Sequence, residues 1–510
     1  MQPAAAQLDD RTWADLNLDD VYVAVDRTTS TLGRAALYHR MRAAPAAEHL
    51  DAFETLVTRM TDDTAARTRA SRALDRLQEP NGYDLWWLEQ PDAIDPRPWH
   101  VLFPLLGVTA LVLLIASIRW PTMLPAFLGI VAVSVVVRYA TDRGVFTRAT
   151  AFRQLAPIIA TGQALGFLND AGASPITAPL RADVPRLTRL KAIARWVSGD
   201  PLMLAVNPNP LAGIATEVVS VVYEYLNLVF LLDANGVYFG GKDLRTHGRA
   251  LLRVLTAIGD VDVAISVAAL RAETSPWCRP VFVSAGSPIT MTSARHPLVA
   301  NAVPNTITLA AGRGLVVTGS NMSGKSTLLR TVGVNIVMAQ TLHTSFAAEY
   351  SAPQLSVRSC IGRSDDIVSG KSYYMAEVEA LLDLVRISAR ETPHMFLLDE
   401  LFRGTNAVER IAAGQAVLRE LLAGGGGHLH SALAATHDDE LTDLLVDRYD
   451  AVHFGDDVGE SGLVFDYRLK SGRATTRNAI ALLKLNGAPE RLLADALACA
   501  AILDHQRAGR

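Results

Sequence analysis

Cysteine is scarce in this chain. Only three cysteines occur among 510 residues, Cys278, Cys360 and Cys499, and they are widely separated. A disulfide framework needs paired cysteines, and a zinc site needs closely spaced ligands. The sequence therefore argues against both, and it is typical of a protein in a reducing, cytosolic setting.

A large excess of one charge is also absent. The chain has 48 basic and 52 acidic residues, a formal net charge of −4. Proteins that attract nucleic acid through a general field carry a basic domain or stripe, so any contact with DNA must be local. One basic strip could make such a contact, but a solvated helix face or a surface near lipid headgroups explains it more readily. Its members are Arg181, Arg186, Arg189, Lys191 and Arg195.

The N-terminus lacks the pattern of a secretion signal. Where a signal would have basic residues followed by an apolar stretch, this chain has Asp9 and Asp10 in a polar segment. We therefore expect no cleavable signal.

Two long uncharged runs stand close together. Residues 101–118 and 122–137 contain no charged side chain, and each run has about the length needed to cross a bilayer as a helix. They predict a transmembrane helical hairpin over residues 97–140. The alternative is a pair of buried core helices in a soluble protein.

Basic residues near the hairpin predict its orientation. Arginines flank the outer ends of the two runs, whereas Arg119 alone lies in the connection between them. Positively charged flanks stay on the cytoplasmic side. The sequence therefore predicts a two-span cell-membrane protein whose large segments are both cytoplasmic. The flanking residues are Arg97, Arg138, Arg143 and Arg148.

The predicted secondary structure of the remaining sequence changes near Pro280. Before it the patterns are mainly helical, and after it short β-rich runs alternate with helices. We predict an α/β P-loop ATPase domain together with an all-α core domain that the membrane hairpin interrupts. The predicted segments are an N-terminal helical part at 1–96, the hairpin at 97–140, a helical core or lever at 141–279, the ATPase domain at 280–485 and a C-terminal helical dimerisation segment at 486–510.

A phosphate-binding motif follows the strand predicted at 315–318. The pattern G-x-x-x-x-G-K-S in a strand–loop–helix context is specific for a P-loop. Backbone N–H groups of such a loop surround phosphates, Lys325 neutralises the β/γ oxygens, and Ser326 is a ligand for Mg²⁺. The predicted ATP-binding residues are Gly319, Ser320, Asn321, Met322, Ser323, Gly324, Lys325, Ser326 and Thr327.

Two carboxylates end a later apolar strand, 394–399. Paired acids after a P-loop can hold Mg²⁺ with one member and polarise water with the other. We assign Asp399 to the metal and Glu400 to the role of general base. A further strand ends at His437, which could hydrogen-bond the γ-phosphate or the attacking water, although an isolated histidine is more often structural.

Together these motifs resemble the ATPase domain of the MutS family, of the ABC/MutS type. The matching segments are GSNMSGKST at 319–327, DIVSGKSYYMAEV at 366–378, LLDELFRGTN at 397–406 and ATHDDEL at 435–441. The resemblance implies that Ser372 reaches the nucleotide of a partner subunit. It therefore implies a homodimer with composite ATP sites, in which Lys325, Glu400 and His437 are catalytic.

The chain also departs from the family pattern. The usual proline of the phosphate loop is Ser320, and Tyr373 and Tyr374 follow the signature serine. No Phe-x-Glu occurs, and the family-like core begins within the first thirty residues. We therefore expect no mismatch-reading domain in this chain.

Several functions remain open. The first is a MutS-family ATPase in which ATP drives a dimeric conformational switch at the membrane, with lipid as a partner and DNA as a non-specific ligand. The alternative is a mismatched-DNA or damage sensor of mismatch repair. A nucleotide-locked membrane scaffold is a third, against which Glu400 argues, and two short spans disfavour a transporter.

Overall fold

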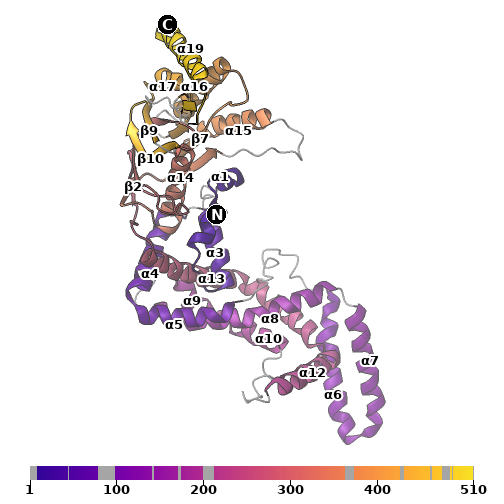
Figure 1. Cartoon of the computed structure of the whole chain (residues 1–510). Helices are drawn as coiled ribbons and strands as arrows, with labels where there is room; N and C mark the ends of the chain where they lie inside the picture. Colours follow the sequence, from indigo (N-terminus) through magenta and orange to yellow (C-terminus); the bar gives the residue numbers. More distant parts are fainter. Residues whose placement is uncertain are drawn as a thin grey trace. The chain divides into compact units, whose positions relative to one another are not determined.

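The structure is a computed structural model that describes residues 8–43, 45–78, 98–140, 143–169, 174–198, 212–361, 373–424, 430–459, 462–473, 480, 483–484 and 486–508. Its internal contacts define two compact units (Figure 1). Unit 1 comprises Met1–Val25, Tyr38–Leu50 and Leu270–Arg510, and unit 2 comprises Asp26–Leu37 and Asp51–Ala269. This grouping differs from the predicted segments, because two stretches near the N-terminus contact the C-terminal half.

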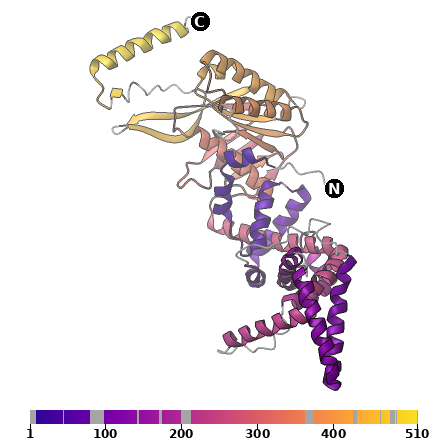
Figure 2. The ribbon, with the colours of Figure 1, turned by 90° about the vertical axis from the view of Figure 1, so that its right-hand side faces the viewer.

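A six-stranded sheet organises unit 1. Its strand order is β10-β9-β4-β8-β7-β6, and every neighbouring pair is parallel except β10 and β9. The strands are β4 (Gly314–Thr318), β6 (Ser356–Cys360), β7 (His394–Asp399), β8 (Ser431–Ala435), β9 (Tyr449–Gly459) and β10 (Gly462–Ser471). In Figure 2, β9 and β10 form the long gold hairpin at one edge of this sheet. The mixed α/β character expected from the sequence is confirmed.

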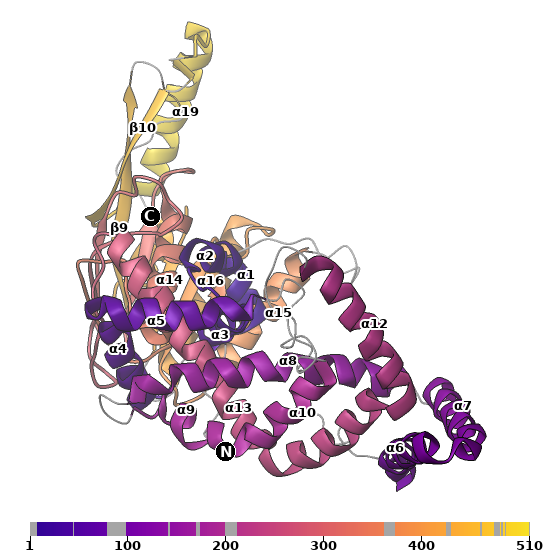
Figure 3. The same ribbon diagram turned by 90° about the horizontal axis from the view of Figure 1, so that it is seen from below.

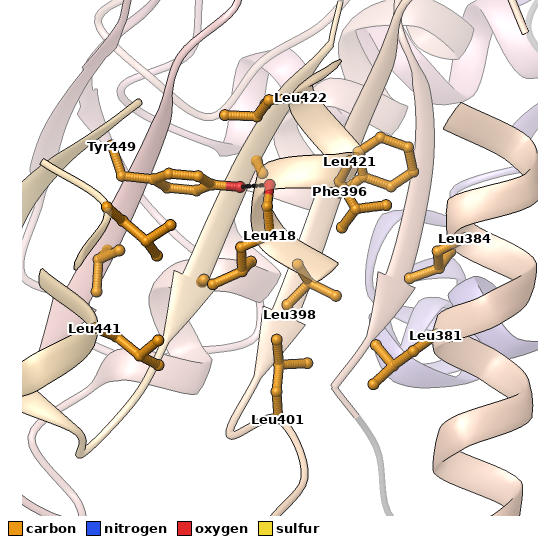
Figure 4. Packing of buried hydrophobic residues seen from close by; sticks show 14 of the residues in the cluster. Leu381, Leu384, Phe396, Leu398, Leu401, Leu418, Leu421, Leu422, Leu441 and Tyr449 are labelled. Atoms are coloured by element: carbon orange, nitrogen blue, oxygen red, sulfur yellow. Dashed lines mark hydrogen bonds between the residues drawn. The ribbon is translucent and has the colours of Figure 1, made fainter. Parts of the chain in front are cut away.

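Alternating side chains of β7 face two different helix layers. Phe396 and Leu398 join a buried cluster with α15 (Tyr373–Ser388), α16 (Ala407–Ala423) and α17 (Asp439–Leu444), as Figure 4 shows. Tyr449 closes this cluster by donating its hydroxyl to Leu418 O at 2.8 Å. Leu397 lies on the opposite face, against α14 (Lys325–Leu342). The two-residue period of a strand therefore lets one apolar run support both layers.

The helix that follows the phosphate loop is held by arginines at its C-terminal end. α14 is buried along almost its whole length. Its last carbonyls bind arginines: Arg40 Nε donates to Thr341 O at 2.7 Å, and Arg271 Nη2 donates to His343 O at 2.7 Å. Cations at a helix C-terminus complement the dipole and satisfy otherwise unpaired carbonyls. These contacts position the N-terminus of α14, where the candidate site lies.

Unit 1 also contains N-terminal helices and a smaller sheet. The Asp15 side chain of α1 accepts hydrogen bonds from Ser359 Oγ and Ile361 N, both at 2.8 Å, and so binds the end of β6. A four-stranded sheet has the order β1-β5-β2-β3. The remaining elements are α1 (Asp10–Asp15), α2 (Leu18–Val25), β1 (Val281–Phe282), β2 (Ile289–Ala294), β3 (Asn305–Leu309), β5 (Glu349–Ala352) and α19 (Glu490–Ala508).

The described part of unit 2 consists of helices and the turns that connect them. Its longest helix, α13, has 42 residues. The helices wholly or partly in this unit are α3 (Thr31–Arg42), α4 (Ala47–Asp62), α5 (Thr64–Leu74), α6 (Leu102–Arg119), α7 (Leu124–Ala140), α8 (Arg143–Ala164), α9 (Ala178–Ala182), α10 (Thr188–Ser198), α12 (Ala212–Phe230) and α13 (Leu232–Glu273), with short 3₁₀ turns η1 (Asp75–Leu77), η4 (Pro98–Val101), η5 (Pro121–Met123), η6 (Leu165–Asn169) and η7 (Val184–Leu187).

A buried aspartate binds the start of α3 to α13. Asp262 accepts hydrogen bonds from Thr29 N at 2.9 Å, Ser30 N at 2.7 Å and Ser30 Oγ at 2.6 Å. Burial raises the pKa of Asp262, although these hydrogen bonds act in the opposite direction. The helices approach so closely that a Cβ on Gly33 would lie 2.1 Å from Asp262 Oδ2. Glycine is therefore required at this position for the helices to pack.

The two apolar runs form the helical pair α6 and α7, which contact each other. Small buried residues, Ala110 and Ser134, lie on them. Most of their surface is uncovered: only 11% of the most apolar 18-residue window of Trp99–Arg119 and 6% of that of Pro121–Tyr139 are buried in the described structure. The alternative of two buried core helices is therefore wrong for the part of the chain that the structure describes.

Candidate nucleotide-binding site

The phosphate loop joins the buried strand β4 to α14. Gly319 and Gly324 have φ values of +143° and +110°, a region that side chains with a Cβ rarely adopt. A Cβ on Gly319 would also lie 2.8 Å from Ser323 Oγ and 3.0 Å from Phe454 O. The two glycines therefore permit the tight turn that directs backbone N–H groups toward a phosphate.

Lys325 is the first residue of α14, and its side chain reaches back to the phosphate loop. Its side-chain Nζ donates hydrogen bonds to Gly319 O at 2.9 Å and Ser320 O at 2.8 Å. Burial lowers the pKa of Lys325, while the nearby carboxylates of Glu400 and Asp399 raise it. An ammonium group held by carbonyls can exchange them for the oxygens of a bound phosphate, which are better partners.

Ser326, in the first turn of α14, lies next to Asp399, the last residue of β7. The Ser326 hydroxyl donates to Asp399 Oδ2 at 2.6 Å. Burial raises the pKa of Asp399, although the bond from Ser326 lowers it. The other oxygen, Asp399 Oδ1, is buried and has no hydrogen-bond partner among the described residues. Hard oxygen donors in this arrangement fit Mg²⁺.

Glu400 lies in a constrained backbone position directly after β7. Its φ is +51°, which is uncommon outside glycine and is often found at functional sites. Its Oε1 lies 2.7 Å from His437 Nε2, and its Oε2 lies 2.9 Å from Arg403 Nη1. Both partners restrain this carboxylate near the phosphate loop.

His437 connects the loop to the acidic pair. Its Nε2 lies 2.8 Å from Asn321 Oδ1 and 3.3 Å from Lys325 Nζ, in addition to its contact with Glu400. One ring nitrogen carries at most one proton, so a protonated Nε2 can donate to either Asn321 Oδ1 or Glu400 Oε1, whereas an unprotonated Nε2 can accept from the Lys325 ammonium. The side chain is thus placed to exchange partners when a phosphate enters.

A pocket of about 520 Å³ extends from the phosphate loop. Lys325, Ser326 and Glu400 line one side of it, and the segment 294–303 with Asn305 lines another. Phe454 and Tyr467 supply aromatic surface. A space of this size fits a ligand as large as a nucleotide.

The structure brings together Lys325, Ser326, Asp399, Glu400 and His437. Ser372, the predicted contact in trans, lies outside the described residues. The basic strip predicted as a possible DNA contact lies in unit 2, on α9, η7 and α10.

Sequence reasoning missed three residues of this site. They are Arg403, Phe454 and Tyr467. Arg403 lies within the matching segment 397–406, but its contact with Glu400 depends on the turn after β7. The two aromatic residues come from β9 and β10, far along the chain. The family resemblance extends to residues 467–472, which include Tyr467, but no local pattern assigns either aromatic residue to the pocket.

A mainly parallel sheet with a phosphate loop after β4 and paired acids at the end of β7 defines the class of P-loop nucleotide-binding proteins. Within that class, the family model described as MutS domain V matches residues 315–504.

Several similar proteins also carry the name MutS. "DNA mismatch repair protein MutS 2" of Halobacterium salinarum is 34% identical over 257 residues, which cover 48% of this chain and 28% of that protein. "DNA mismatch repair protein MutS" of Sorangium cellulosum is 33% identical over 267 residues, 50% of this chain and 28% of that protein. The protein of the same name from Thermus caldophilus is 30% identical over 272 residues, which cover 52% of this chain and 32% of that protein. Residues 315–504 of this chain therefore belong to the MutS domain V family, and the matches span less than a third of the length of these relatives.

Proposed function

We propose that this chain is a MutS-type ATPase that binds and hydrolyses ATP with Mg²⁺ in the pocket beside the phosphate loop. One observation carries the proposal: His437 Nε2 lies 3.3 Å from Lys325 Nζ and 2.7 Å from Glu400 Oε1, and the residues next to these two in the chain, Ser326 and Asp399, are joined by a hydrogen bond of 2.6 Å. Phosphoryl transfer needs mainly positioned charge, and this cluster supplies it.

Each residue then has a separate task. Lys325 releases the carbonyls of Gly319 and Ser320 and binds β/γ oxygens. Ser326 and Asp399 hold Mg²⁺, which neutralises charge on the phosphates. Glu400 accepts the proton of the attacking water, while Arg403 and His437 hold the Glu400 carboxylate in place.

We propose further that the active form is a homodimer with composite sites. Ser372 of one chain would reach the nucleotide of its partner, as the family resemblance implies. ATP binding would then close the pair of ATPase domains, and hydrolysis would release them.

Replacing the lysine of the loop tests nucleotide binding. Lys325→Ala should abolish binding of a fluorescent ATP analogue in the presence of Mg²⁺, because no other cation replaces its ammonium in the loop. Lys242→Ala is the matched control, since Lys242 is exposed on α13 and should leave binding unchanged. Unchanged binding by Lys325→Ala would overturn the site.

Two outputs of the ATP cycle are candidates. The names of the relatives favour a role in DNA mismatch repair, as a sensor that ATP releases from mismatched DNA. The uncovered surfaces of α6 and α7 support the other candidate, a switch anchored in the cell membrane with its large segments in the cytoplasm. A nucleotide-locked scaffold without turnover is the third, and the placement of Glu400 beside the loop speaks against it.

Equilibrium DNA binding separates the first two outputs. Purified full-length protein is titrated with fluorescent homoduplex and single-mismatch DNA, with and without ATP, over a salt series. A preference for the mismatch that ATP abolishes would favour the repair role. Weak, salt-sensitive binding without preference would leave the membrane switch.

A further inference from the structure

We propose that α12 is a membrane-surface helix whose Val221, Val222 and Tyr225 contact the interfacial layer of a lipid bilayer. The proposal rests on the proposed membrane attachment through α6 and α7, and it adds a third lipid-contacting helix to that pair.

α12 is fastened to both helices of the pair. Asn235 Nδ2 donates to Phe230 O at 2.9 Å and to Phe103 O at 3.4 Å, joining the end of α12 to the start of α6. A Cβ on Gly107 would lie only 3.0 Å from Phe230 O, so the two helices approach closely there. On α7, Arg138 Nη2 lies 3.5 Å from Glu224 Oε2. α12 is therefore held near the outer ends of the pair.

The opposite face of α12 is occupied by protein. The Tyr223 hydroxyl donates to Val197 O of α10 at 2.7 Å. Asn227 Nδ2 donates to Asp233 Oδ2 at 2.6 Å, and Asp233 N donates back to Asn227 Oδ1 at 2.9 Å. Residues 221, 222 and 225 recur at helical spacing on the other side, where all three are exposed. The rotation of α12 is thus fixed with an apolar face outward.

The direction of α12 suits a helix at a membrane surface. In Figure 1, α6 and α7 run vertically, and Figure 3 looks along that direction, so both appear foreshortened. α12 remains extended in Figure 3 and lies crosswise to the pair. Helices that lie in the interfacial plane bury their apolar face roughly 5–10 Å into the boundary between headgroups and acyl chains.

Lipid explains this face better than a second protein does. The helix that carries it contacts both α6 and α7, whose apolar surface is uncovered and which a bilayer would cover. Tyr225 and Tyr139 are 67% and 82% exposed beside this junction, and tyrosine is enriched at membrane interfaces. Because Arg138 neutralises Glu224, the contact needs no anionic headgroup, and zwitterionic lipid is sufficient.

Fluorescence quenching by spin-labelled lipids tests the contact. Tyr225→Cys, Ile115→Cys on α6 and Leu252→Cys on α13 are made separately in a Cys499→Ser background and labelled with a polarity-sensitive dye. Cys278 and Cys360 are half-buried, and burial raises their thiol pKa values to about 11 and about 12, so they react poorly. The unsubstituted Cys499→Ser protein measures any residual labelling.

The full-length proteins are placed in phosphatidylcholine nanodiscs with the quencher near the headgroup or near the bilayer centre. The dye at position 225 should lose most of its fluorescence to the shallow quencher, the dye at 115 to the deep quencher, and the dye at 252 to neither. Quenching at 115 without quenching at 225 would overturn the α12 proposal alone. Quenching at neither position would overturn the membrane attachment as well, and a dye at 225 shielded from both lipid and aqueous quenchers would mean a protein partner.

Discussion

Among single residues, the best indication of what the candidate site binds is a buried polar atom that has no hydrogen-bond partner among the described residues. Asp399 Oδ1 is such an atom among the described residues, and it lies beside the Ser326 hydroxyl. A buried carboxylate oxygen without a donor is costly unless a ligand completes it. This atom is therefore the strongest sign of a metal in the described site.

Removing the metal ligand should raise the Mg²⁺ requirement. In Asp399→Asn, the concentration of Mg²⁺ that gives half-maximal ATP turnover should rise by about 10- to 100-fold, because the anionic ligand is lost. Asp438→Asn is the control, since that carboxylate pairs with Arg410 and should leave the Mg²⁺ dependence unchanged. An unaltered Mg²⁺ curve for Asp399→Asn would remove this residue from the metal site.

A second residue-scale prediction concerns acid stability. Burial lowers the pKa of His394 to about 4, against an ordinary value of 6.5. The folded chain therefore holds this histidine neutral, and stability should fall as pH drops from about 6.5 toward 4. Between about pH 7 and pH 5 the loss should be on the order of 2 kcal/mol.

Urea unfolding of the full chain at the two pH values checks the histidine. His394→Gln should lose less stability on acidification than the wild type. The exposed His39→Gln should behave as the wild type does. Equal acid sensitivity in wild type and His394→Gln would show that His394 does not titrate in this way.

At the scale of elements, the sequence predicted the strands around the site well. The predicted strand 394–399 coincides with β7, and the strand predicted at 315–318 is β4 with one further residue. Both are short apolar runs bounded by turn residues or acids, which is local information. The family resemblance extends to residues 294–298 and 467–472, but the local sequence did not place the pocket wall at 294–303 or the aromatic residues of β9 and β10 at the site, because their position depends on contacts between segments far apart in the chain.

The packing of α3 on α13 gives a sharp element-scale prediction. Gly33→Ala should destabilise unit 2 by about 1–3 kcal/mol, because the new Cβ would meet Asp262 Oδ2. Gly248→Ala is a matched control in α13, where a Cβ meets no atom within 4 Å. It should be neutral or stabilising by up to about 1 kcal/mol.

The urea concentration at the midpoint of unfolding measures both variants. A Gly33→Ala midpoint equal to that of Gly248→Ala would contradict the close approach of the two helices.

For the whole molecule, the family resemblance predicted more about the protein than the local sequence motifs did. The motifs alone predicted a phosphate site, while the order of the four matching segments predicted the MutS family, which the comparisons bear out. The dimer stays a prediction, because Ser372 lies outside the described residues. The membrane location also stays a prediction, which the uncovered surface of α6 and α7 supports.

Mixing two inactive variants tests the composite site. Ser372→Ala and Lys325→Ala should each lack turnover as homodimers. Subunit exchange should restore about a quarter of the wild-type rate, because half of the dimers are then mixed and each of these has one complete site. No recovery, with exchange demonstrated by fluorescence transfer between labelled chains, would show that the site is not shared.

The proposed function requires that this chain turn over ATP at the cluster around Lys325 and Glu400. The most direct measurement is the Mg²⁺-dependent ATPase rate of the purified full-length protein beside that of Glu400→Gln, with Glu409→Gln as an exposed control. We expect turnover that EDTA abolishes and that Glu400→Gln lowers by about 10²- to 10⁴-fold while ATP still binds. Wild-type turnover by Glu400→Gln, or ATP binding without turnover by the wild type, would contradict the proposed function.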